Sequence, residues 1–154
     1  MLRGMKTPAQ RTIRRAQSAD ADAIKRLLTE ARLPTEDFDS AIKLQFWVYE
    51  EGGVLLGTIG LERHADGGLL RSLVVATSHR HRGVGTRLVA QLEHDSQSEG
   101  VGQLVLLTQT SEPLFHRLGY LVVDRKNVPD GLKQTAEFSS LCPATAVCMT
   151  KFLS

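Results

Sequence analysis

The chain alternates apolar and polar segments, and the spacing of its apolar residues predicts strands and helices in turn. The clearest pattern is the apolar run 69–75, Leu-Leu-Arg-Ser-Leu-Val-Val, which predicts a buried strand preceded by two glycines. From Gly83 to about Glu99, apolar residues recur at spacings of three and four, which predicts a helix that Gly100 ends. A second apolar run, 103–108, predicts a strand in the interior of a sheet.

Weaker forms of the same patterns predict the remaining elements, which Gly, Pro and polar turn residues separate. In chain order they are a strand at 11–16, a helix capped by Ser18 or Asp20 and ended by Pro34, a polar connector at 35–44, strands at 46–50 and 54–62 joined by a turn at 51–53, a turn at 66–68, a short helix from 111 to 119, a strand at 120–123, a polar loop at 127–135 and a last strand at 146–152.

The order of these elements predicts an α/β fold. Strands joined by short turns come first and favour antiparallel pairing, and a strand–helix–strand unit follows them. Because a helix connects strand 69–75 to strand 103–108, the connection must cross over the sheet, and those two strands should be parallel. We therefore expect a mixed, mainly antiparallel sheet with helices on both faces.

Length and composition narrow the class of protein. A chain of 154 residues predicts one domain, which we place at 11–154 after a disordered extension at 1–10. The formal net charge of +2 argues against a nucleic-acid binder. Apolar runs fall short of the ~18 residues that a membrane span needs. Cys142 and Cys148 are too few for a zinc site, and they fit a reducing cytoplasm at least as well as one disulfide. We expect a cytoplasmic protein without a metal ion.

A basic, glycine-containing loop between the central strand and the long helix predicts a phosphate site. The first backbone N–H groups of a helix and its dipole attract anions, and Gly83 and Gly85 let the anion approach the main chain. Arg80 and Arg82 add positive charge. The Lys-Ser/Thr pair of a nucleotide triphosphatase loop is absent, and Leu88 stands where a dinucleotide-binding turn has its third glycine.

The spacing of Arg80, Gly83 and Gly85 after a strand resembles the pyrophosphate loop of the GNAT superfamily of acetyl-CoA-dependent N-acetyltransferases, and the resemblance extends from Thr12 to Leu153. It implies the GNAT acyl-CoA N-acyltransferase fold, in which the central parallel strands splay apart and admit the acyl chain of acetyl-CoA. It also implies a small-molecule amine as acceptor, and a homodimer is common in this superfamily. The cofactor-binding residues implied in this way are Leu73, Val74, Val75, Arg80, His81, Arg82, Gly83, Val84, Gly85, Thr86, Phe115 and Arg117.

The segment 135–149 is similar to the C-terminal signature of the arsinothricin N-acetyltransferase group within that superfamily, and 60–62, 69–73 and 115–119 fit it as well. The group acetylates the α-amino group of arsinothricin, an arsenical mimic of glutamate, and its relatives act on phosphinothricin. The resemblance therefore implies arsenic or antibiotic resistance. Ala136 departs from the pattern, because an arginine is expected there, which bears on substrate preference.

Acetyl transfer to an amine requires the amine to be neutral, and a carboxylate can assist by accepting its proton. Glu62, at the end of strand 54–62, is the candidate catalytic base, and a solvated strand-end acid is the equal alternative. Backbone N–H groups near 73–75 are candidates to polarise the thioester carbonyl. Many superfamily members protonate the leaving thiolate with a tyrosine where this chain has Phe115, so we expect water to do so, and Tyr120 to pack in the core.

Arg71 and Ser72 are the candidate substrate-binding residues, with Thr108 on the opposite strand as a weaker one. An arginine within an apolar strand needs a carboxylate partner, which is either Glu62 across the hairpin, or the substrate, or both. The connector 33–39 is expected to roof the pocket.

These observations predict an enzyme that transfers acetyl from acetyl-CoA to the amine of a small amino acid by direct attack in a ternary complex. Neither cysteine lies near the cofactor loop in sequence, which argues against a covalent intermediate. Two alternatives stay open: acetylation of another amine, such as a polyamine, an aminoglycoside or a protein N-terminus, and a non-catalytic acyl-CoA-binding sensor.

Overall fold

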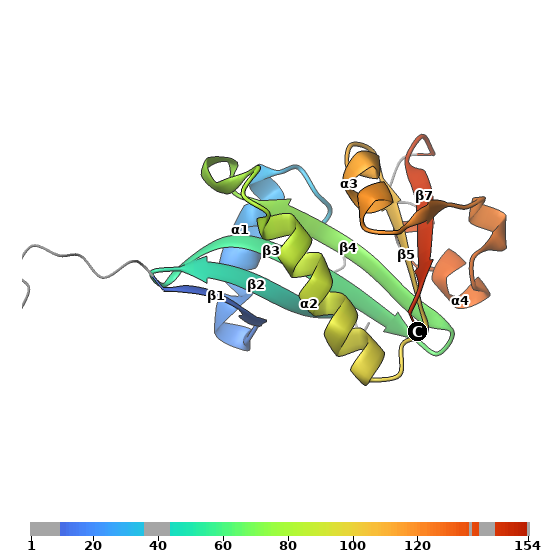
Figure 1. The fold of residues 1–154 in the computed structure, drawn as a ribbon, viewed down its shortest axis with the longest axis horizontal. Helices are drawn as coiled ribbons and strands as arrows, with labels where there is room; N and C mark the ends of the chain where they lie inside the picture. Colours follow the sequence, from blue (N-terminus) through green and yellow to red (C-terminus); the bar gives the residue numbers. More distant parts are fainter. Residues whose placement is uncertain (1–9, 36–43, 136, 139–143, 154) are drawn as a thin grey trace, which may run out of the picture.

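Seven strands form one sheet in the computed structural model of the chain, which describes residues 10–35, 44–135, 137–138 and 144–153 (Figure 1). The predicted extension at 1–10, apart from its last residue, lies outside the described residues, as does most of the predicted connector. The strands are β1 Arg11–Arg15, β2 Leu44–Glu51, β3 Val54–His64, β4 Gly67–Val75, β5 Gln103–Thr108, β6 Leu121–Val122 and β7 Val147–Phe152, and the helices are α1 Ala21–Glu30, α2 Val84–Ser98, α3 Glu112–Arg117 and α4 Asp130–Lys133.

The strand order is β1-β2-β3-β4-β5-β7-β6. Within the described residues, every neighbouring pair is antiparallel except β4 and β5, which are parallel and joined by the crossover through α2. The prediction of an α/β fold with a mixed, mainly antiparallel sheet is confirmed.

The parallel ladder between β4 and β5 is very short. It aligns only Gly68 with Leu104 and Leu69 with Val105, whereas β5 and β7 align over six residue pairs. Beyond those two pairs the strands diverge toward α3 (Figure 1). The splay that the family resemblance implies is therefore present.

A bulge in β4 accompanies this divergence. In the ladder with β3, Thr58 aligns with Val74 and Gly60 with Arg71, so two residues of β4 face the one remaining residue of β3. One of these two residues is Ser72, whose φ of 61° lies in the left-handed region that non-glycine residues rarely adopt. A bulge bends its strand and re-aims the side chains beside it.

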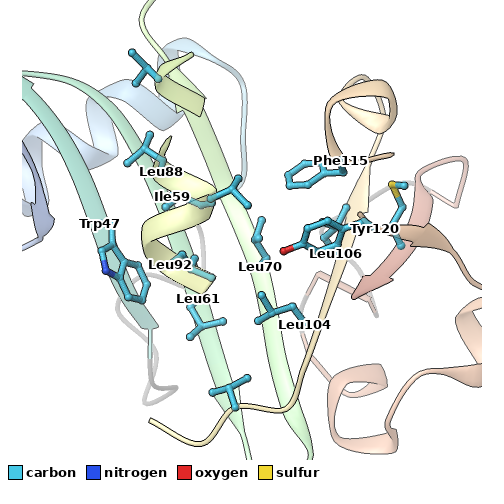
Figure 2. Close-up of a cluster of buried hydrophobic side chains, with 14 of the residues drawn as sticks. Trp47, Ile59, Leu61, Leu70, Leu88, Leu92, Leu104, Leu106, Phe115 and Tyr120 are labelled. Atoms are coloured by element: carbon cyan, nitrogen blue, oxygen red, sulfur yellow. The ribbon is translucent and has the colours of Figure 1, made fainter. Parts of the chain in front are cut away.

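Helices cover both faces of the sheet, as predicted. On one face, Leu88 and Leu92 of α2 pack over Ile59 and Leu61 of β3 and Trp47 of β2 (Figure 2). These side chains are almost fully buried, and apolar burial of this kind stabilises by about 25 cal/mol per Å².

The other face is covered by α1 and α4. Ile24 and Leu28 of α1 form a cluster with Val48 of β2 and Val74 of β4. Val48 lies between two residues of the opposite cluster, so the period-two alternation of β2 separates the two faces.

Two local predictions are wrong. The stretch 127–135, predicted as a polar loop, contains α4, because Pro129 starts a short helix that buries Leu132 against β4 and β5. Gly68, predicted in a turn, lies inside β4. A side chain there would meet Leu61 Cδ1 at 2.7 Å, so the glycine permits close packing within the sheet.

Tyr120 packs in the core, as predicted. Its side chain is fully buried beside Leu104 and Leu106 (Figure 2), and its hydroxyl donates to Glu93 at 2.7 Å. Lys151 donates to the same carboxylate at 3.1 Å. Burial, together with the charge of Glu93, raises the pKa of Tyr120 far above its usual value.

We expect Tyr120→Phe to lower the free energy of unfolding by about 1.5 kcal/mol, the low end for a hydrogen bond to a charged group, because Glu93 keeps Lys151. Turnover measured by CoA release should stay at the wild-type level. A large fall in kcat without a fall in melting temperature would contradict this structural role.

Candidate active site

A cavity of about 450 Å³ opens where β4 and β5 separate. Its described walls come from the residues that follow α1 (31–34), from β4 (70–73), from the end of β5 and the following turn (106–111), from Phe115 of α3, and from the C-terminal segment. The connector 33–39 is the predicted roof of the pocket. Its residues Leu33 and Pro34 line the cavity, and 36–39 lie outside the described residues.

The structure brings five of the predicted site residues to this cavity. They are Arg71, Ser72, Leu73, Thr108 and Phe115.

Arg71 is the centre of a buried charge cluster. Its side chain has no exposed surface, and its Nη1 lies 3.3 Å from Glu62 Oε1. Its Nε lies 3.4 Å from Glu137 Oε1 and donates to Ser72 Oγ at 3.3 Å. The ion pair predicted across the hairpin is therefore present. One arginine and two glutamates give these three residues a formal charge of −1.

Glu62 lies behind Arg71 and is not among the described residues that line the cavity. It is 1% exposed, and its second carboxylate oxygen lies 2.6 Å from Nε2 of His64, a residue for which sequence gave no role. The strand β3 runs to His64 instead of ending at Glu62, which places both side chains on the same face of the sheet. The catalytic role of Glu62 stays a prediction.

Glu137 was missed as a site residue. It is 4% exposed and is the one carboxylate among the described residues lining the cavity. The one feature of the sequence that could have indicated Glu137 is its negative charge, which stands out among the small and apolar residues around it.

The start of α2 has the geometry of an anion site. Gly83 has a φ of 77° at the N-cap, with no side-chain cap, and the first helical hydrogen bond runs from Arg87 N–H to Gly83 C=O. The backbone N–H groups of residues 83–86 therefore have no partner within the helix. They point outward at the positive end of a 15-residue helix.

The basic residues of the loop have different surroundings. Arg80 donates from Nε to the carbonyl of Val75 at 3.1 Å, so it ties the loop to the end of β4. His81 and Arg82 are exposed beside the helix start, as is Thr86, and Arg117 is exposed on α3.

The remaining cofactor candidates lie inside the protein. Val84 is 4% exposed and packs under α2, and Val74 packs toward α1. Val75 lies partly buried at the end of β4. The roles predicted for the backbone N–H groups of 73–75 stay predictions.

One contact joins His79, before the loop, to the end of β2. His79 Nε2 lies 3.3 Å from Glu51, which also accepts a hydrogen bond from the Tyr49 hydroxyl at 2.9 Å. The hydrogen bond from Tyr49 lowers the pKa of Glu51, so this carboxylate is ionised near neutral pH.

The described cavity wall offers no tyrosine hydroxyl. Phe115 lines the cavity, and the centroid of its ring lies 5.3 Å from that of Tyr120, edge to face. The Tyr120 hydroxyl donates a hydrogen bond to Glu93. Cys148 is 4% exposed in β7 and outside the cavity wall, and burial raises the pKa of its thiol to about 11. Cys142 lies outside the described residues.

The part of the chain that the structure describes contains no group of three or more His, Cys, Asp or Glu residues arranged to hold a metal ion. None of its helices is both long and apolar enough to span a membrane.

The splayed pair of β4 and β5, followed by a helix α2 that starts at Gly83, is the arrangement that the family resemblance implies. Residues 43–122 match the family described as "Acetyltransferase (GNAT) domain". The chain belongs to this family and is an acetyl-CoA-dependent N-acetyltransferase.

Individual proteins that are similar to this chain in sequence or fold support the assignment to this family. An uncharacterized N-acetyltransferase of Chlorobaculum tepidum is 26% identical over 147 residues, which cover 91% of this chain and 92% of that protein. Rv2747 of Mycobacterium tuberculosis, solved in complex with CoA, has the same fold with a TM-score of 0.76 and 22% identity, covering 93% of this chain and 99% of its own.

The N-acetylglutamate synthase of Neisseria gonorrhoeae, solved with coenzyme A and N-acetyl-glutamate, also has this fold. The TM-score is 0.77 at 21% identity over 96% of this chain. The chain spans only 36% of the length of the synthase.

We expect Gly85→Val to weaken CoA binding. An added Cβ lies 3.9 Å from Val75 Cγ2 and from Leu114 Cδ2, which is ordinary contact, and it adds bulk beside the backbone N–H groups at the start of α2. It is a sharper test than Gly83→Val, because the positive φ of Gly83 would add about 1–2 kcal/mol of backbone strain.

The measurement is the rise in melting temperature on adding CoA. A tenfold weaker Kd lowers ligand stabilisation by about 1.4 kcal/mol at saturating CoA. Gly102→Val is the matched control, because its Cβ meets nothing within 4 Å, and it should keep the wild-type rise. Equal rises for both variants would remove this loop from the phosphate site.

Proposed function

We propose that the enzyme transfers acetyl from acetyl-CoA to the α-amino group of a small amino acid, or of an amino-acid-like toxin of the arsinothricin or phosphinothricin type. The observation that carries this proposal is the pair of opposite charges, Arg71 and Glu137, side by side in the wall of the cavity. The reaction is direct attack in a ternary complex.

An α-amino acid carries the matching pair of charges, an ammonium and a carboxylate. A guanidinium binds a carboxylate through two parallel hydrogen bonds, which gives Arg71 a geometric preference that a point charge lacks. A zwitterion adds no net charge to the buried cluster. A polyamine would bring several positive charges toward the one carboxylate of the described wall, so the cavity favours the amino acid.

Two further observations support this acceptor. The gonococcal synthase of the same fold was solved with N-acetyl-glutamate, an acetylated amino acid. In addition, Glu137 belongs to the segment 135–149, which is similar to the arsinothricin group's signature, and it lies in the cavity wall. The signature therefore contributes a charged side chain to the acceptor pocket.

The acceptor preference can be measured by CoA release with matched pairs of amines. Each pair is an amino acid, such as phosphinothricin, arsinothricin or glutamate, and its α-carboxamide. If Arg71 binds the α-carboxylate, the acid should exceed the amide by roughly ten- to a hundredfold in kcat/KM, from a contact of about 1.5–3 kcal/mol. Equal rates for acid and amide, or best turnover with spermidine or an aminoglycoside, would refute the amino-acid acceptor. CoA binding without turnover of any amine would indicate a sensor.

Arg71→Lys tests the carboxylate contact from the protein side. Lysine keeps the positive charge between Glu62 and Glu137 but loses the planar fork, so kcat/KM for the acid should fall about tenfold and that for the amide much less. Arg71→Ala is less informative, because it would leave Glu62 and Glu137 buried without the cation that they share, at a cost of about 3–5 kcal/mol. A lysine variant that loses acid and amide activity equally would assign Arg71 to the structure alone.

A further inference from the structure

We infer that Glu137 holds the ammonium group of the acceptor and takes its proton, and that Glu62 positions Arg71 from behind. This assignment rests on the proposed function, which places an amine in the cavity. It differs from the expectation based on sequence, in which Glu62 was the candidate base.

The surroundings of Glu62 argue for a positioning role. One of its oxygens contacts Arg71 Nη1 at 3.3 Å and the other contacts His64 Nε2 at 2.6 Å, and the residue is 1% exposed. Arg71 lies on the cavity side of Glu62. A guanidinium does not release its protons in proteins, so it cannot carry a proton from the acceptor to Glu62.

Glu137 has the opposite placement. It lines the cavity directly, and it contacts Arg71 at Nε, whereas Glu62 contacts Nη1. An ammonium placed beside Glu137 is attracted to its carboxylate, and in a site of low dielectric this attraction is stronger than in water.

The same placement orients the acceptor. With its carboxylate at Arg71 and its ammonium at Glu137, a bound amino acid is held at two points of one wall. Leu73, one of the two residues in the bulge of β4, lies on the same wall. Positioning of this kind is itself a large part of the rate enhancement in a ternary complex.

The proton balance of the step is complete. The ammonium gives one proton to a Glu137 carboxylate oxygen, leaving a neutral amine and a protonated carboxyl. The nitrogen lone pair forms a C–N bond to the thioester carbonyl carbon, and the C–S bond breaks with its electron pair on sulfur. The thiolate takes the second proton from nitrogen, and Glu137 releases its proton to solvent. The products are the N-acetyl compound, CoA thiol and one proton.

The experiment compares Glu137→Gln and Glu62→Gln in kcat/KM from pH 6 to pH 9, using the best amine found in the substrate panel. Without a base, the rate follows the fraction of neutral amine, which rises about tenfold per pH unit below the pKa of the amine. We therefore expect the deficit of Glu137→Gln to be largest at pH 6 and to shrink to a few fold at pH 9. The deficit of Glu62→Gln should be the same at every pH.

Three controls keep the test decisive. Asp130→Asn removes a carboxylate whose side chain is 90% exposed, and it should behave as wild type. The CoA-induced rise in melting temperature reports whether each variant is folded. If Glu137→Gln is unfolded, Glu137→Asp replaces it: this variant keeps the carboxylate, so it should retain the wild-type pH profile at a reduced rate.

A flat deficit for Glu137→Gln, or a deficit that shrinks with pH only in Glu62→Gln, would overturn the assignment. Either result can be told apart from a failure of the amino-acid proposal. The substrate panel decides the acceptor, and the pH slopes decide the base for whichever amine is turned over.

Discussion

The early end of the ladder between β4 and β5 is the constraint on which the site depends, because the sheet must open there without exposing its core. The two strands align at only two residue pairs. The bulge at Ser72 then bends β4 away, and Phe115 and Tyr120 fill part of the wedge from the side of α3 (Figure 2). What is left between the strands is a cavity of about 450 Å³ with Arg71 at its wall. Backbone polar groups along such an opening need hydrogen-bond partners, so an extended ligand that can supply them is a natural occupant.

The buried charges beside this opening are costly for folding. Removing an arginine and its glutamates from water carries a desolvation penalty that their attraction often does not repay, and apolar replacements of similar size are frequently more stable. Arg71 and Glu62 are nevertheless 3% and 1% exposed. The proposed function gives the cluster a role in recognition. Glu62, whose other oxygen contacts His64, holds Nη1 of the guanidinium, and Glu137 lies in the cavity wall.

Much of the fold could be predicted from sequence, because its signals are local. The period of apolar residues marked the long helix and the strands around it, and glycine spacing marked the loop that we expect to bind phosphate. The ion pair between Arg71 and Glu62 could be anticipated since both residues belong to one hairpin. Contacts between distant segments could not. Glu137 reaches Arg71 from a stretch more than sixty residues further along the chain, and no local pattern encodes that approach. The helix α4 was missed for the same reason, because its one buried anchor, Leu132, is stabilised by strands far away in sequence.

Phe115 has no hydroxyl with which to protonate the leaving thiolate. Two costs can therefore be compared, that of releasing the thiolate and that of deprotonating the amine. The thiol of CoA resembles that of cysteine, with a pKa of about 8.5, so releasing it as thiolate at pH 7 costs only about 2 kcal/mol. Deprotonating the amine costs more, about 1.4 kcal/mol for each unit by which its pKa exceeds the pH. In a free amino acid the neighbouring carboxylate raises that pKa, and a carboxylate held by Arg71 loses most of this influence. In the proposed complex, the arginine that binds the acid therefore also makes the adjacent amine easier to deprotonate. A Lys-like amine, with a pKa of about 10.4, has no carboxylate whose influence Arg71 could cancel. The proposed contact with Arg71 would therefore favour α-amines through reactivity as well as through binding.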